Sequence, residues 1–234
     1  MAKDQDKAKA AAQAKAKGAA AQAKAQAAKN AGPGFKVDNE ESNLPIPEPR
    51  LAKLYRDKIV AQLQADLGVK NKHAVPRLQK IVISMGLGKA MVAGEKAKME
   101  TAEKELAIIA GQKPVRCKAK KSVAQFKVRE GLETGLKVTL RGNRMYEFLD
   151  RMISLAIPRV KDFRGLSPNG FDKQGNYNFG FNEQTVFPEI AGSDTNFQQG
   201  MNITMVTNGQ TVKASRELLK QFGFPFKTDE KIKD

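Results

Sequence analysis

Residues 113–141 read KPVRCKAKKSVAQFKVREGLETGLKVTLR, and two runs within them alternate between polar and apolar side chains. Successive side chains of a strand point to opposite faces of a sheet, so each run predicts a strand with two unlike faces. In the strand at 115–120 the polar face holds Arg116, Lys118 and Lys120. In the strand at 136–141 it holds Lys137, Thr139 and Arg141. The opposite faces are expected to pack on helices; they hold Val115, Cys117 and Ala119, and Leu136, Val138 and Leu140.

The other periodic segments predict helices and strands in an irregular order. The predicted helices span 51–67, 95–110, 143–157 and 212–222. The further predicted strands span 78–85 and 201–207, and the Gly- and Asn-rich segment 163–180 is expected to be irregular. Asn143 is expected to cap the third helix and Pro158 to end it. Because helices and strands do not alternate strictly, we predict a two-layer α+β fold, with helices on one face of a mostly antiparallel sheet and the other face free.

The N-terminal part of the chain differs in composition from the rest. Residues 1–34 are mostly Ala, Lys and Gln, with no Leu, Ile, Val or Phe, and the motif AAAQAKA occurs at 10–16 and again at 19–25. A segment without large apolar side chains has nothing to bury, so we predict a disordered tail. Three alternating prolines make 35–50 an extended linker. Residues 51–234 are expected to form a single α+β domain.

The charge balance limits the classes of partner. The chain has 41 Lys and Arg against 25 Asp and Glu, a net charge of +16, which indicates polyanionic partners. No apolar run is long enough for a membrane span, and the N-terminus lacks the apolar core of a secretory signal. A single Cys excludes an intrachain disulfide. We therefore expect a cytoplasmic protein that binds nucleic acid and has no membrane partner.

Catalytic interpretations fail on residue types and spacing. His73 and Cys117 are the only His and Cys, which excludes a Cys/His metal cluster and leaves the pair as ordinary loop and strand residues. The Gly86–Lys89 motif GLGK lacks the third Gly of a dinucleotide loop and the Ser or Thr of a P-loop. Its glycines permit a close approach to a neighbour, and the pattern fits protein and RNA equally well. We expect no enzyme activity, catalytic site, metal, cofactor or small-molecule substrate.

The strongest functional signal is a basic stretch at 113–129 that contains no acidic residue. Its seven cations are Lys113, Arg116, Lys118, Lys120, Lys121, Lys127 and Arg129. Like charges at this density repel one another unless a polyanion neutralises them, so phosphate binding is favoured over a merely solvated surface. A wide basic face on the free side of the sheet suits the shallow minor groove of double-stranded RNA. Phe126, at the tip of the connecting loop, either stacks on a base or packs into the core.

Six segments in order resemble a known family. They are VPR at 75–77, MGLG at 85–88, GQKPVRCKAKKSVAQFKVREG at 111–131, KVTLRG at 137–142, IPRVKDFRGL at 157–166 and FPEI at 187–190. Together they resemble the bacterial large-subunit ribosomal protein numbered five, a 5S rRNA-binding family, over residues 51–226. Two departures stand out, because the family commonly has Asn at Ser84 and Gly at Gln125. The shorter Ser84 side chain and the stiffer loop backbone at Gln125 put those two contacts in doubt.

The resemblance implies a structural constituent of the large ribosomal subunit that attaches 5S rRNA to it. It also implies contacts with 23S rRNA, with peptidyl-site tRNA and with a protein of the small-subunit head. By position, the 5S contacts fall on Lys80, Ser84, Met85, Gly86, Gln112, Lys113, Lys118 and Thr139, to which the strand pattern adds Arg116 and Arg141. The tRNA-facing loop holds Lys120, Lys121, Ser122, Gln125, Phe126, Lys127 and Arg129. The small-subunit contact falls on Phe163, Arg164, Asn176 and Tyr177.

Two other classes of function compete with this interpretation. The Ala/Lys tail alone resembles the tails of nucleoid or chaperone-like proteins, and deletion of residues 1–34 separates the two hypotheses. An enzyme is the weakest alternative, because the sequence has no paired acid and base. What the tail touches, the order of the strands and the pairing of cations with phosphates do not follow from the sequence.

Overall fold

The computed structural model describes residues 47–190, 197–209 and 211–227. The predicted tail and all of the predicted linker before Pro47 lie outside the described residues. The described part forms an α+β fold around one five-stranded sheet with the order β2-β3-β1-β5-β4. The strands are β1 (Leu78–Gly86), β2 (Val115–Lys118), β3 (Glu133–Leu140), β4 (Tyr177–Phe181) and β5 (Met201–Thr207). Every neighbouring pair is antiparallel, which confirms the predicted fold class.

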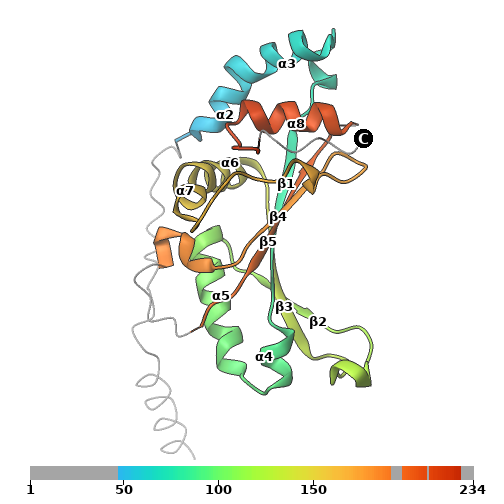
Figure 1. Ribbon diagram of the computed structural model, residues 1–234, viewed down its shortest axis with the longest axis vertical. Coiled ribbons are helices and arrows are strands. Elements are labelled where there is room, and N and C mark those ends of the chain that lie inside the picture. The colour runs from blue at the N-terminus through green and yellow to red at the C-terminus, as the bar shows by residue number, and fades with distance from the viewer. Residues whose placement is uncertain (1–46, 191–196, 210, 228–234) are drawn as a thin grey trace, which may run out of the picture. The chain divides into compact units, whose positions relative to one another are not determined.

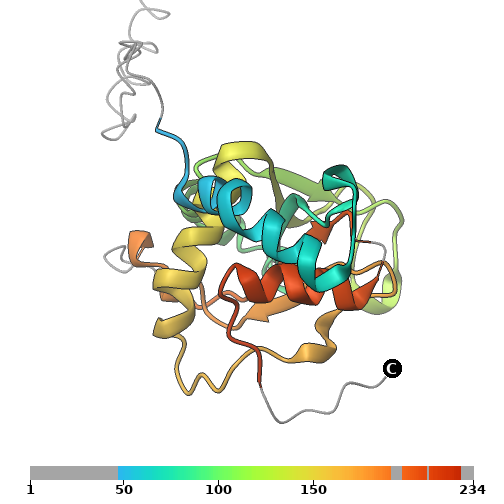
Figure 2. The same ribbon diagram turned by 90° about the horizontal axis from the view of Figure 1, so that it is seen from above.

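Helices cover one face and one end of this sheet. The helices are α2 (Arg50–Leu54), α3 (Val60–Leu67), α4 (Gly88–Val92), α5 (Lys96–Ala110), α6 (Gly142–Arg151), α7 (Ile157–Arg159) and α8 (Val212–Gln221). α5 packs on β3 and α6 on β1, and Figure 1 shows both helices, with α7, on the left side of the strands. α3 and α8 lie side by side at the upper end, as Figure 2 shows from above. No helix covers the right side of the strands in Figure 1 between α8 and the loop after β2.

The period-two pattern of the two central strands explains the core. On β1, Ile81, Ile83 and Met85 are buried, and they lie in register with Leu140, Val138 and Leu136 of β3, which are buried too. These six side chains share the face that α5 and α6 cover. On α5, the residues that were predicted to face inward are buried; they are Met99, Leu106 and Ile109. The alternation therefore fixes which face of β1 and β3 the helices cover.

A second part of the core is aromatic and surrounds Tyr177. Its ring lies 4.7 Å from the ring of Phe171 and 5.5 Å from that of Phe226, measured between centroids. The Tyr177 hydroxyl donates a hydrogen bond of 2.8 Å to the Ser167 carbonyl. Burial raises the pKa of Tyr177 to about 12. This cluster joins β4 to the C-terminal residues after α8.

Several predicted boundaries need correction. The segment 163–180 is not irregular throughout, because β4 occupies its end. The short helix α4 begins at Gly88, the last residue of the GLG motif. Asn143 lies inside α6 and caps nothing; Arg141 occupies the cap position and Gly142, with φ +58°, turns the chain between β3 and the helix. Pro158 does not end the helix either, since a π-helical turn at Met152–Ala156 precedes it and the helix continues to Arg159.

The close approach of β1 and β3 gives a stability prediction. A Cβ on Gly135 would lie 2.5 Å from the Met85 carbonyl oxygen, whereas a Cβ on its register partner Gly86 would meet no atom within 4 Å. We expect Gly135→Ala to lower the free energy of unfolding by about 1–3 kcal/mol, because the backbones must separate. Gly86→Ala is the control and should change it by less than about 0.5 kcal/mol. Urea unfolding measures both, and equal losses would contradict the packing described.

Candidate RNA-binding surface

The side of the sheet without helices carries a polar surface, which we call the open face. It is formed by Lys80, Val82 and Ser84 of β1, Lys137 and Thr139 of β3, Asn202, Thr204 and Val206 of β5, Asn178 of β4 and Val115 of β2. The register places Ser84 between Lys137 and Asn202, and Val82 between Thr139 and Thr204. Thr204 Oγ1 donates a hydrogen bond of 2.7 Å to Asn178 Oδ1.

The open face is rich in neutral hydrogen-bonding groups rather than in charge. Of its residues on the strands, Lys80 and Lys137 are the cations, and the polar remainder are hydroxyls and amides. Gly86 and Gly180 lie exposed at its border, where the backbone itself can be approached. Gln199 extends this border, because its Nε2 donates a hydrogen bond of 2.9 Å to the Gly86 carbonyl. Such a surface can donate to and accept from 2′-hydroxyls and base edges.

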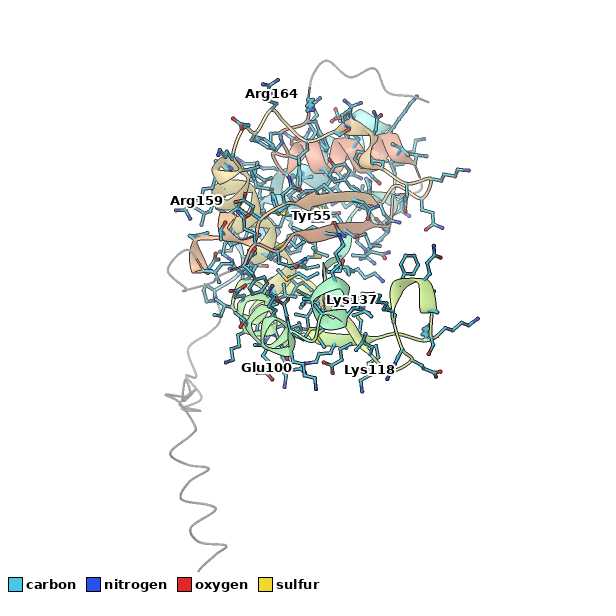
Figure 3. The ribbon with its side chains drawn as sticks, turned by 60° about the horizontal axis from the view of Figure 1, so that its bottom comes forward. Tyr55, Glu100, Lys118, Lys137, Arg159 and Arg164 are labelled. Carbon is cyan, nitrogen blue, oxygen red and sulfur yellow. The ribbon has the colours of Figure 1, made fainter. Side chains whose placement is uncertain are left out.

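The predicted orientation of β2 is wrong. Arg116 lies in register with the buried Leu136, and Cys117 with Gly135, so Arg116 points to the helix-covered side and Val115 to the open face. Val115 is 68% exposed. After a register shift between Cys117 and Lys118, Lys118 lies opposite Glu133, and both residues line a hollow with Met99 and Glu100 of α5. Arg116 and Lys118 therefore do not share a face with Lys137 and Thr139 (Figure 3 labels Lys118 and Lys137).

Arg116 is occupied by carboxylates. Its Nε donates to Glu103 Oε2 of α5 at 2.7 Å, and its Nη1 donates to Glu133 Oε2 of β3 at 3.2 Å. The hydrogen bond to Glu103 raises the pKa of Arg116. Of the seven cations in the basic stretch, this one is neutralised by acids from other parts of the chain. Among the described residues no ion pair involves the other six.

The connection between β2 and β3, residues 119–132, is here named the basic loop. A bridge between Val123 and Val128 closes it, and Ser122 Oγ accepts a hydrogen bond from the Glu130 amide. Its cations are all exposed: Lys120, Lys121, Lys127 and Arg129. Phe126 is 68% exposed, so of the two alternatives for this ring the structure excludes the core. Gln125 is exposed beside it.

The other predicted site residues fall in different surroundings. Met85 is buried on the helix-covered side, so only its backbone is near the open face. Gln112 and Lys113 lie in the turn before β2, half-buried and exposed respectively, and Arg141 is exposed after β3. Of the predicted contacts, Lys80, Ser84 and Thr139 therefore have side chains on the open face, with Gly86 at its border, whereas Lys113 and Arg141 are exposed next to the strands.

The residues predicted to face the small subunit do not form one surface. Arg164 is exposed and projects from the upper edge of Figure 3, whereas Phe163 packs partly against the core. Asn176 is used internally, since its amide nitrogen donates to Asp172 and its Oδ1 accepts from the Thr207 amide. Tyr177 is 1% exposed. Within this set, Arg164 is exposed, and Phe163 and Asn176 are half-buried.

The sequence interpretation missed most of the open face. Asn178, Asn202 and Thr204 were not among the predicted contacts, and neither was Lys137, although the strand pattern had placed it on the polar face. The alternation of 201–207 carried the signal for Asn202 and Thr204, because Met201, Ile203 and Met205 are the buried partners. Across residues 47–190, 197–209 and 211–227, no group of three or more His, Cys, Asp or Glu side chains could hold a metal ion. Within the same residues no helix has the length and apolar character of a membrane span.

Comparison with known proteins gives the family. A family model described as "Ribosomal protein L5" matches residues 71–129, and a second model, which describes the C-terminus of the same ribosomal protein family, matches residues 133–226. A "Large ribosomal subunit protein uL5" of Thermosipho africanus is 52% identical over 177 residues, which cover 76% of this chain and 97% of the relative. The chain belongs to the ribosomal protein L5 family. Proteins of the same name from Dichelobacter nodosus and Wolinella succinogenes are 49% and 51% identical, over 98% and 95% of their lengths.

Membership in the L5 family fixes the general role. The chain is a structural constituent of the large ribosomal subunit and not an enzyme. The two family models match residues 71–129 and 133–226, so they include the open face and, apart from residues 130–132, the basic loop of this L5-family protein. The tail at 1–34 lies outside both matches.

Proposed function

We propose that the chain binds 5S rRNA with the open face and so attaches it to the large subunit. The observation that carries the proposal is an uncovered sheet face with hydroxyl, amide and two ammonium groups in register across β3, β1 and β5. The minor groove of an A-form helix is wide and shallow and displays 2′-hydroxyls, so a flat polar sheet fits it. Lys80 and Lys137 would hold phosphates at its border, while Ser84, Thr139 and Thr204 would contact ribose and base edges.

We propose a separate role for the basic loop, which is contact with peptidyl-site tRNA. Its four exposed cations lie on a connection beyond the end of the sheet, so they can reach a second RNA while the open face is occupied. The exposed Phe126 ring would stack on a base or ribose, which adds affinity that does not depend on sequence. Gln125 would add a hydrogen-bonding arm beside it.

Two further contacts complete the proposal. Arg164 and the half-buried Phe163 would meet a protein of the small-subunit head, with Asn176 and Tyr177 supporting the fold behind them. Contact with 23S rRNA is proposed from the family resemblance and from the net charge of +16. A positive charge of this size fits an RNA with many phosphates better than it fits a small acidic ligand.

Titration with 5S rRNA tests the central part of the proposal. We expect the full chain to bind 5S rRNA at least about 100-fold more tightly than a scrambled RNA of equal length at the same salt concentration. A chain without residues 1–34 should bind 5S rRNA within about threefold of the full chain, because the open face does not include the tail. Equal affinity for both RNAs would end the proposal of 5S recognition. Loss of binding on deletion of the tail would favour the nucleoid-like alternative.

A further inference from the structure

Arg116 connects three elements on the side of β2 that faces away from the open face. Its guanidinium donates hydrogen bonds to Glu103 of α5 and to Glu133 of β3. One side chain therefore joins the edge strand β2 to the neighbouring strand β3 and to the helix α5. The side chain of Glu103 is 16% exposed and that of Glu133 is 26% exposed, which makes both carboxylates partly shielded partners. A forked guanidinium between two acids has a defined direction that a single ammonium lacks.

The position of this contact along β2 matters. β2 is an edge strand of the sheet, and its register shifts one residue beyond Arg116, between Cys117 and Lys118. Beyond the shift, the basic loop is joined at its base by the Ala119 amide to Leu132 carbonyl bond of 2.8 Å and the Gly131 amide to Ala119 carbonyl bond of 3.0 Å. A bulge bends a strand, so the direction of the loop depends on what holds the part of β2 just before the bend, where Arg116 lies.

We propose that Arg116 is a positioning residue, which holds β2 against α5 and thereby sets the direction of the basic loop. It does not contact phosphate itself, because two carboxylates occupy its donors on the helix-covered side. Its effect on tRNA contact rests on the function proposed for the loop, whereas its effect on loop order does not. The chain thus separates cations that bind RNA from one that holds the binding loop in place.

Substitutions with matched changes of charge test this proposal in the full-length protein. Arg116→Gln and Lys120→Gln each remove one positive charge, one from the cluster and one from the exposed loop. The double variant Glu103→Gln/Glu133→Gln keeps the arginine charge and removes both of its partners. The first measurement is hydrogen exchange of the loop amides in the protein without RNA, with the amides of β1 as the internal reference.

The expected exchange rates of the loop amides distinguish a residue that positions the loop from a residue that binds RNA. Arg116→Gln and Glu103→Gln/Glu133→Gln should each accelerate exchange at Ala119, Val123, Val128 and Gly131 by about fivefold or more, and Lys120→Gln should not. Arg116→Lys should give an intermediate rate, because it keeps the charge without the fork. Unchanged loop exchange in both the Arg116→Gln and the double Glu variant would overturn the proposal. If Arg116→Gln fails to fold, the double Glu variant alone decides in the same way.

The second measurement is the salt dependence of tRNA binding. Lys120→Gln should reduce the slope of log affinity against log salt by about 0.7–0.9, the value for one lost phosphate contact. Arg116→Gln should weaken binding and leave that slope unchanged. A reduction of the slope by Arg116→Gln as large as that by Lys120→Gln would overturn the proposal. If the wild-type chain binds no tRNA, the proposed function of the loop fails, and the exchange measurement still decides the role of Arg116.

Discussion

Exchange of Lys80 and Lys137 for Glu is expected to weaken 5S rRNA binding by about 100-fold, or roughly 3 kcal/mol. Both ammonium groups lie on the open face, on the adjacent strands β1 and β3. Each substitution removes a phosphate contact and places a carboxylate against the RNA backbone, so attraction becomes repulsion. The slope of log affinity against log salt should fall by about 1.4–1.8 for the two lost contacts.

The matched control is Lys58→Glu/Lys104→Glu. Lys58 follows α2 and Lys104 lies on α5, and both are exposed away from the open face. The control changes the net charge by the same amount, so it should weaken binding only through the long-range field, by about threefold at physiological salt. Filter binding at several salt concentrations measures both variants. Equal losses in the two would mean that net charge alone, and not this face, binds the RNA.

Replacement of Lys120, Lys121 and Lys127 by Ala is expected to weaken tRNA binding by about 30- to 100-fold and to lower its salt slope by about 2–3. The three ammonium groups are exposed on the basic loop, and none has an ion pair with another described residue. Binding of 5S rRNA should change by less than about threefold, because the open face keeps its contacts.

The comparison of the two RNAs tests the division of labour. Competition between labelled tRNA and unlabelled 5S rRNA on the same variant gives both affinities in one experiment. Phe126→Ala is a second test of the loop. Loss of stacking should weaken the free energy of tRNA binding by about 1–3 kcal/mol and leave the salt slope unchanged. A collapse of 5S binding in the triple variant would show that the loop belongs to the 5S site.

The central strands could be predicted from the sequence because burial selects one face of each. In β3 Leu136, Val138 and Leu140 alternate with Lys137 and Thr139, which leaves a single choice of orientation. In β1 Val82 interrupts the alternation, and Lys80 and Ser84 indicate the polar face. The same holds for α5, where Met99, Leu106 and Ile109 lie on one stripe. Antiparallel pairing of such strands and the position of the helices follow from these patterns.

The orientation of β2 could not be predicted in the same way. The edge strand β2 is largely exposed on both faces, so burial does not decide which face carries its cations. Arg116 finds Glu103, which is thirteen residues earlier in the chain, and this pairing has no local signal. Val115 is apolar and yet 68% exposed. Polarity alone therefore indicated the wrong face.

β4 shows a different reason for a missed element. Tyr177, Phe179 and Phe181 alternate with Asn178 and Gly180, so the period of two is present. The Gly and Asn residues suggested a loop, because both are rare in strands. Packing of the aromatic cluster around Tyr177 outweighs that local preference.

The corrected orientation of β2 changes which surface is expected to bind RNA phosphates through positive charge. With Arg116 and Lys118 on the helix-covered side, the open face is less basic than the sequence pattern indicated. Recognition of 5S rRNA is then expected to depend more on hydroxyl and amide contacts, and the strongest salt dependence should come from the basic loop. Specific contacts and phosphate contacts differ in this way in other RNA-binding surfaces.

Lysine acetylation of the protein, free and bound to 5S rRNA, tests most directly which face holds the RNA. Mass spectrometry reports the reactivity of each lysine, so the two sides of the sheet are read in one sample. We predict that Lys80 and Lys137 become protected on binding, whereas Lys104 on α5 keeps its reactivity. Protection of Lys104 with no change at Lys80 and Lys137 would place the RNA on the helices and contradict the account.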